Sequence, residues 1–85
     1  EGKMYVRKFE NTNKIYKNLL RYRKEAGLSQ RAMSAEMMKL GIPMYQQMLG
    51  KIERNERYVL EEEVRGFCQI LHVSPEELLM HEGAD

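Results

Sequence analysis

Residues 28–57 read LSQRAMSAEMMKLGIPMYQQMLGKIERNER, and this stretch decides the fold. Ser29 is a suitable cap for a helix that runs from Gln30 to Leu40, where a glycine ends it. Pro43 disfavours helical geometry at the residue before it, so a short connection follows. The next helix begins at Met44 or Tyr45 and reaches about Arg54. Two short helices with a glycine-containing connection are typical of helix-turn-helix architecture.

Helical periodicity continues on both sides of this stretch. Apolar residues spaced by four, three and four predict a helix over 13–26 that Gly27 ends. Further along, the pattern predicts a helix over 60–71 and a short one that starts at Ser74-Pro75. No segment shows the alternation of a β-strand. We therefore predict an all-α bundle of five helices over 13–80, with an N-terminal arm at 1–12 and a frayed tail at 81–85.

The inward faces of these helices define the predicted core. Gly66 lies inside a predicted helix despite its low helix propensity, which suggests that a neighbouring helix approaches closely there. Met38, Met44 and Met80 are expected to be exposed. The core is predicted to contain Ile15, Leu19, Leu28, Met33, Met37, Leu40, Leu49, Ile52, Val64, Phe67, Leu71, Val73 and Leu78.

Composition bounds the class of protein. The chain has 85 residues, of which 42% are hydrophobic and 32% charged, so one small globular domain is expected. No apolar run approaches the roughly 20 residues that a membrane span needs. Cys68 is the single cysteine, which excludes a disulfide within the chain and a zinc site built on cysteine pairs. A free thiol beside seven methionines fits a reducing compartment, and a cytoplasmic location is expected.

Charge is distributed unevenly along the chain although its net value is only +1. Residues 1–31 carry +6, residues 32–59 carry +1 and residues 60–85 carry −6. Such asymmetry can produce a dipolar surface with one side suited to a polyanion. The alternative is that folding intermixes these charges and that they serve only solubility.

Catalytic and metal-binding patterns are weak. His72 and His81 lack the spacing of a metal motif, and Ser29, Ser34 and Ser74 lack a nucleophile elbow. The chain also contains no glycine-rich phosphate loop. We therefore expect no enzyme activity, metal, cofactor or small-molecule substrate.

The predicted helix over 44–54 carries polar residues on its outward side. Gln46 and Gln47 open it, and Lys51 lies one turn further on. Glutamine can pair with adenine and lysine with guanine in the major groove, and a recognition helix contacts base edges with its N-terminal residues. The alternative is that the two glutamines only solvate an exposed helix end.

Residues 15–79 resemble the Cro/C1-type (XRE) helix-turn-helix family. The resemblance rests on GLSQ at 27–30, KIERNERYV at 51–59 and LHVSPEELL at 71–79, which follow in the family's order and spacing. It implies a lambda-repressor-like domain of five helices, in which the helix over 44–54 is the recognition helix. The implied base contacts are Gln46, Gln47 and Lys51, and the implied phosphate contacts are Gln30, Tyr45, Arg54, Asn55 and Arg57.

The chain also departs from the family pattern. The connection before the recognition helix is longer than in the shortest members, and Tyr45 stands where serine or threonine usually caps that helix. Asn55 and His72 replace glycines, although both residue types tolerate left-handed backbone geometry. Glu56 dilutes the positive charge of its arginine neighbours.

The expected function is that of a sequence-specific transcriptional regulator, a repressor of phage or mobile-element type. It would bind double-stranded operator DNA as a homodimer. Two alternatives remain open at this level. The bundle could be a protein-interaction module, antitoxin-like or bridging, that uses exposed methionines. The chain could also be one domain of a larger regulator.

Overall fold

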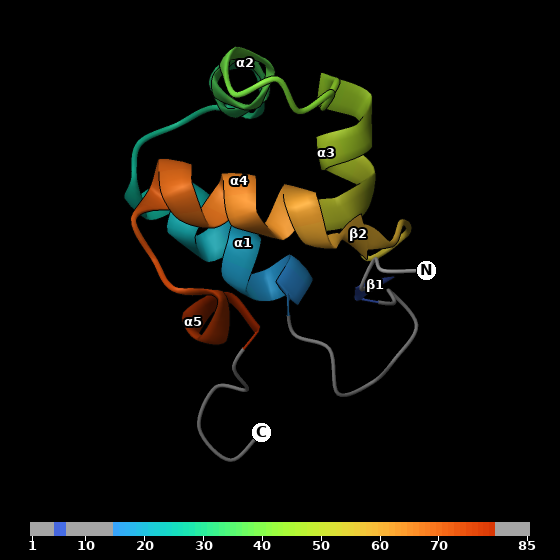
Figure 1. Ribbon diagram of the computed structural model, residues 1–85, viewed down its shortest axis with the longest axis vertical. Coiled ribbons are helices and arrows are strands. Elements are labelled where there is room, and N and C mark those ends of the chain that lie inside the picture. The colour runs from blue at the N-terminus through green and yellow to red at the C-terminus, as the bar shows by residue number, and fades with distance from the viewer. Residues whose placement is uncertain (1–4, 7–14, 80–85) are drawn as a thin grey trace.

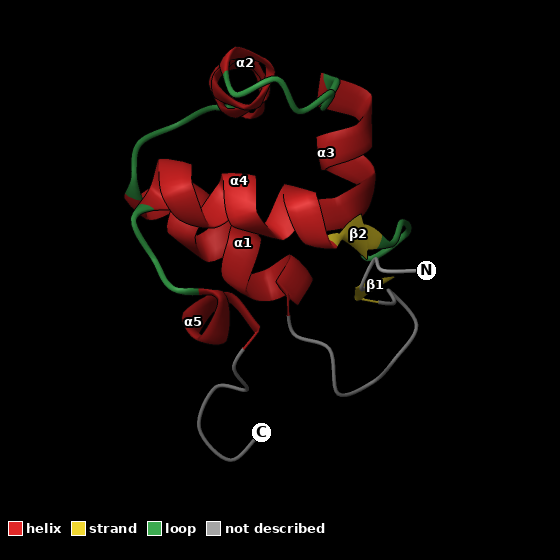
Figure 2. Cartoon of the chain, in the orientation of Figure 1, coloured by secondary structure: helices red, strands yellow, loops and turns green. Residues whose placement is uncertain are grey.

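The computed structural model describes residues 5–6 and 15–79, and within them the chain forms five helices and one pair of short strands (Figure 1). The secondary structure is mostly helical, as Figure 2 shows in red. Every predicted helix is found, with ends that differ by about two residues at most. The elements are β1 (Tyr5–Val6), α1 (Ile15–Glu25), α2 (Gln30–Lys39), α3 (Gln46–Glu53), β2 (Val59–Leu60), α4 (Glu61–Leu71) and α5 (Pro75–Leu79).

The expectation that no strand forms is wrong at four residues. Strands β1 and β2 pair antiparallel, with Tyr5 opposite Leu60 and Val6 opposite Val59. A strand of two residues is too short to show alternation, and its partner lies more than fifty positions away in the sequence. The pairing places part of the predicted arm at 1–12 beside the start of α4. The rest of that arm, the tail at 81–85 and Met80 lie outside the described residues.

Local sequence signals set the ends of the helices. The Ser29 hydroxyl accepts a hydrogen bond from the Ala32 backbone N–H at 3.0 Å, which caps α2 as predicted. Asn55 and His72 have φ of 63° and 59°, so both adopt the left-handed geometry expected where they replace glycine. These turns end α3 and α4 sharply and fix the directions in which the following segments leave.

Burial confirms most of the predicted core. Phe67 and Leu19 are fully buried, and Leu28 and Val73 are half-buried against the core. Two assignments are wrong: Leu40 is 38% exposed, while Met44, which was expected to be exposed, is fully buried. The reason is that α2 ends at Lys39, so the connection rather than another helical turn sets the direction of the residues after it.

The close approach predicted at Gly66 is present. A Cβ at this position would lie 2.7 Å from Ile42 Cδ1 and 2.8 Å from Met37 Sδ. Glycine therefore lets α4 pack tightly against α2 and the connection that follows it. In exchange, the helix accepts a residue of low helical propensity.

Helices α1 and α4 form the centre of the bundle, with α5 packed against both (Figure 1). Helix α2 is seen end-on at the top of the view while α3 runs down its right side, so these two helices cross steeply. Helix α3 packs against α1 and α2. None of the described helices is long and apolar enough to cross a bilayer.

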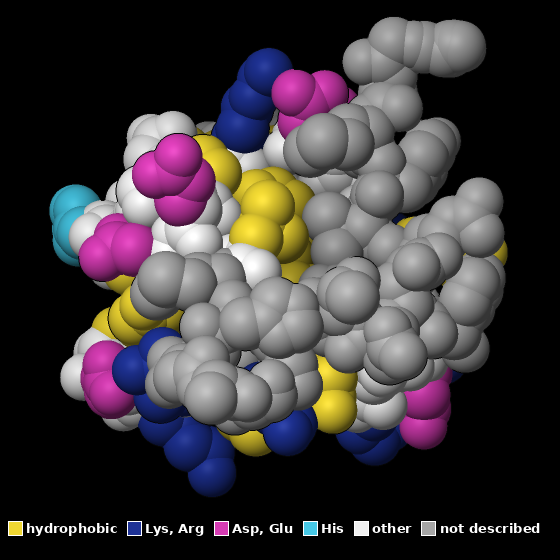
Figure 3. Space-filling model, turned by 90° about the horizontal axis from the view of Figure 1, so that it is seen from below, with side chains coloured by type: hydrophobic (Ala, Val, Ile, Leu, Met, Phe, Trp, Pro, Cys, Tyr) yellow, Lys and Arg dark blue, Asp and Glu magenta, His cyan; other side chains and the backbone are white. Residues whose placement is uncertain are grey.

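Within the described residues, folding places basic side chains from the first third of the chain beside acidic ones from the last third. Helix α5, which begins with Glu76 and Glu77 in its first turn, packs against α1, which exposes Lys17, Arg21 and Lys24. Seen from below, lysine and arginine side chains lie interspersed with acidic ones (Figure 3). Among the described side chains on this face the two signs of charge are intermixed, so the charge asymmetry of the sequence is not a guide to a binding surface there.

Candidate nucleic-acid interface

Helix α3 has a buried face and an exposed face. Leu49 and Ile52 are buried in the core, whereas Gln46, Gln47 and Lys51 are exposed. The 3.6-residue period produces this separation, since position 47 lies on the opposite side of the helix from 49 and 52, and position 46 lies at the edge of the buried face. The three residues predicted to contact bases thus share one outward surface.

A shallow, open groove runs along this surface, which we call the α3 groove. Five of the eight residues predicted to contact DNA line it, and the remaining lining residue is Gly50. The lining residues are Gln30, Gln46, Gln47, Gly50, Lys51 and Arg54. Gln30 comes from the start of α2 and the others from α3 or its end, so the contact between these two helices builds the groove.

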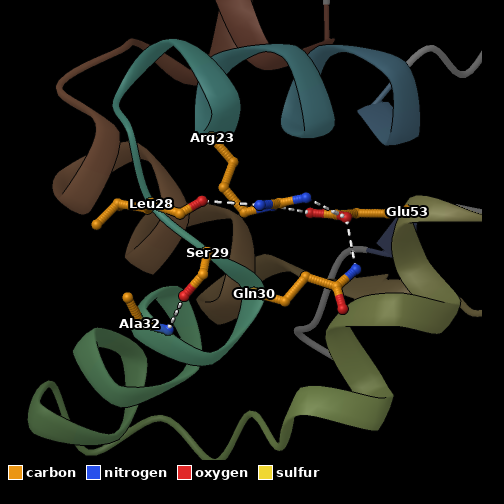
Figure 4. Close-up of polar contacts among 6 residues, drawn as sticks. All are labelled: Arg23, Leu28, Ser29, Gln30, Ala32 and Glu53. Carbon is orange, nitrogen blue, oxygen red and sulfur yellow. Dashed lines mark hydrogen bonds and ion pairs between the residues drawn. The ribbon is translucent and has the colours of Figure 1, made fainter.

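A buried polar network fixes α3 relative to α1 and α2 (Figure 4). The guanidinium of Arg23 makes two hydrogen bonds to the Glu53 carboxylate, from Nε at 2.6 Å and from Nη2 at 3.0 Å. Its Nη1 donates to the Leu28 carbonyl oxygen at 2.7 Å. Gln30 Nε2 donates to the same Glu53 carboxylate at 2.8 Å. One carboxylate on α3 therefore holds the end of α1 and the start of α2.

Both charges of this network lie away from water, with side chains that are 9% exposed for Arg23 and 4% for Glu53. Burial of charge is costly unless the groups are paired and hydrogen-bonded, and both conditions are met here. Sequence reasoning did not assign this pair. The available signal was Glu53 itself, a carboxylate on the apolar stripe that Leu49 and Ile52 form.

The remaining predicted residues lie at the two ends of α3. Tyr45 is 59% exposed, and its side chain makes no capping hydrogen bond within the described part of the chain. Instead its backbone N–H donates to Met48 Sδ at 3.3 Å. Asn55 occupies the turn after α3, and its buried Oδ1 has no partner among the described residues. Neither side chain lines the α3 groove.

Arg57 and Arg54 differ in the number of polar contacts that their side chains make. Arg57 makes two hydrogen bonds to Glu63 at 2.9 and 3.1 Å and a third to the Tyr58 carbonyl oxygen at 2.7 Å. Arg57 also lines a small hollow with Gln47 and Lys51, so it remains beside the outward face of α3. Arg54 is exposed, and its Nη2 lies 3.3 Å from Glu56 Oε1.

A second hollow lies away from α3. Leu28, Leu40 and Ile70 contribute apolar surface to it, and His72 lines its edge. Cys68 is buried nearby in α4, where burial, followed by the negative charge of Glu77, raises the pKa of its thiol. This cysteine is therefore a packing residue rather than a reactive thiolate. The described residues hold no group of three potential metal ligands.

Comparison with models of protein families, with curated proteins and with solved structures returns no match. The interpretation of the α3 groove accordingly rests on its own residues. The groove is a polar surface along α3, with Lys51 and Arg54 as its cations and without an acidic side chain in its lining. Such a surface suits a ligand that offers hydrogen-bond acceptors and negative charge.

Proposed function

We propose that the chain is a sequence-specific DNA-binding transcriptional regulator with a lambda-repressor-like helix-turn-helix, in which α3 is the recognition helix. The observation that carries this proposal is that Gln46, Gln47 and Lys51 are exposed and line one groove, on a helix whose Leu49 and Ile52 are buried in the core. Direct readout of base edges requires a rigidly held helix that carries polar side chains able to adjust to the bases. The resemblance of residues 15–79 to the Cro/C1-type family, with the departures described above, favours the same function.

Base recognition would occur at the start of α3. A glutamine amide can donate to adenine N7 and accept from its N6 amino group, and lysine can donate to guanine O6 and N7. Gln46 and Gln47 stand in the first turn of the helix, where a recognition helix approaches base edges most closely. Lys51 follows one turn later and extends the contact along the groove.

Phosphate contacts would position the domain on the duplex. Gln30 uses one amide hydrogen for Glu53, which leaves its second hydrogen to donate to a phosphate oxygen. Gln30 is also the first residue of α2, and helix N-termini favour anions. Arg57 would add positive charge beside this surface. Operators of this kind are usually read by a homodimer, with half-sites about 34–36 Å apart.

Selection of bound duplexes from a random DNA pool tests this function. The wild-type chain should enrich one motif, and Gln47→Ala should relax the preference at one base pair of each half-site. A bidentate amide–adenine pair contributes about 1–3 kcal/mol of discrimination. The matched control is Gln69→Ala, since Gln69 is also an exposed glutamine on a helix but lines the second hollow.

The control variant should enrich the wild-type motif unchanged. Absence of any enriched motif with the wild-type chain would overturn the proposed function and favour the protein-interaction module. In that module Met38, which is 46% exposed, and Leu40 would be the natural contact residues. The buried Met44 would not contribute.

A further inference from the structure

The side chain of Arg54, at the end of α3, lies back along the helix. Gln46, Gly50 and Arg54 are spaced by four residues, so they form one row on the surface of α3. A Cβ at Gly50 would lie 3.2 Å from Arg54 Nη1, which places the guanidinium directly over this glycine. Helical side chains point toward the N-terminus of their helix, and Arg54 follows this direction. Its charged group therefore lies about one turn from Gln46 rather than beyond the helix end.

Glycine is a poor choice for the middle of a helix unless space is needed. Gly50 is buried, and the atoms nearest to its missing side chain belong to Arg54 and to the Gln30 amide at 3.8 Å. Any larger residue would compete with the guanidinium for this position. The missing side chain at Gly50 therefore leaves a space on the surface of the recognition helix, and the Arg54 guanidinium occupies this space.

We propose that Arg54 reads a guanine base and that Gly50 is the residue that positions it. This inference rests on the proposed function. Arg54 lies in the same groove as Gln46 and Gln47, so a duplex that contacts these glutamines brings a base edge to the guanidinium. Arginine binds guanine O6 and N7 with two parallel hydrogen bonds. The Arg54 Nη2 contact with Glu56 is exposed and occupies one side of the guanidinium, so donors remain for the base.

The structure assigns Arg54 a role different from the phosphate contact that the family resemblance implies. A phosphate contact would strengthen binding to every sequence about equally. A guanine contact strengthens binding only where guanine occupies one particular base pair. The two roles can thus be separated by affinity measurements on duplexes that differ at single positions.

The experiment begins with the motif that the wild-type chain selects and measures affinities for every single-base-pair variant of it. The wild-type chain should prefer guanine at one position by about 5- to 150-fold. Arg54→Ala should remove that preference and leave the other positions unchanged. Arg54→Lys keeps the charge but loses the planar fork, so the preference should fall while non-specific affinity stays the same. Arg65→Ala removes another exposed, ion-paired arginine and should alter nothing.

Variants of Gly50 test the positioning role. Gly50→Ala requires the Arg54 guanidinium to move by only a few tenths of an ångström. This variant should therefore lower the guanine preference a few-fold. Gly50→Met fills the space over the helix and should abolish the preference. Both residues favour helix more than glycine does, so circular dichroism should show a folded chain. In an Arg54→Ala background, Gly50→Met should cause no further loss at that base pair.

Two results would overturn the inference. Uniform weakening of all duplexes by Arg54→Ala, with the guanine preference intact, would establish a phosphate contact. A full guanine preference in Gly50→Met would remove the positioning role. In both cases the wild-type chain still selects a motif, so the proposed function stands. A wild-type chain that selects no motif would overturn the function and this inference together.

Discussion

Arg23 and Arg54 both lie beside α3 near Gln30, and they illustrate two uses of the same side chain. Arg23 is buried and directs three hydrogen bonds to Glu53 and the Leu28 carbonyl oxygen. Arg54 is exposed, lies over Gly50 and shares one surface ion pair with Glu56. A buried arginine whose three nitrogens all donate hydrogen bonds holds the framework together. An exposed arginine with spare donors can exchange its partner for a ligand.

Removal of the buried arginine should have the largest effect. Arg23→Ala leaves the Glu53 carboxylate buried without its cation, so the free energy of unfolding should fall by about 3–5 kcal/mol. Urea denaturation at neutral pH, followed by circular dichroism, measures this change. The double variant Arg23→Met, Glu53→Leu removes both charges and should be more stable than Arg23→Ala. A loss below about 1 kcal/mol in Arg23→Ala would contradict the structural role of this pair.

Arg57 should be intermediate between the buried Arg23 and the exposed Arg54, since its side chain is 24% exposed and that of its partner Glu63 is 3% exposed. Arg57→Ala should reduce stability by about 1.5–3 kcal/mol, because hydrogen bonds to a charged group are lost. It should also weaken binding to all DNA sequences and flatten the slope of log affinity against log salt by about one charge. An unchanged salt slope would assign Arg57 to the framework alone.

Glu56 offers the smallest and most diagnostic change. Glu56→Gln removes a negative charge beside the α3 groove and releases Arg54 from its surface ion pair. DNA affinity should rise by up to about fivefold, since exposed ion pairs contribute at most about 1 kcal/mol. Thermal stability should stay nearly constant. Glu62→Gln is a suitable control at an exposed position outside the α3 groove, and weaker DNA binding by Glu56→Gln would contradict this account.

The sequence was sufficient for the features that depend on local spacing. Ser29 as a cap, the left-handed turns at Asn55 and His72, and the separation of Gln46 from Ile52 all follow from residues within one or two turns. The pairing of β1 with β2 and the exposure of Leu40 depend on contacts or chain directions that periodicity does not encode.

The candidate site divides in the same way. The outward surface of α3 could be predicted because helical spacing directs Gln47 and Lys51 away from the apolar residues and leaves Gln46 at the edge of the same surface. The position of the Arg54 guanidinium could not, because spacing does not show whether this side chain at the helix end lies back over Gly50 or points away from the helix. The Arg23–Glu53 pair lies between these cases. The Glu53 carboxylate lies on an apolar stripe, and a buried carboxylate needs a cation as its partner. The sequence does not identify which cation that is.

Nuclear magnetic resonance on the 15N-labelled chain can show whether the outward face of α3 contacts DNA, as we propose. Addition of the selected duplex should shift the side-chain amide signals of Gln46 and Gln47 strongly, together with the backbone amide of Lys51. The side-chain amide of Gln69, on the second hollow, serves as the internal reference and should stay in place. Shifts at Gln69 and Leu40 with unchanged signals from α3 would show that DNA does not bind to the outward face of α3.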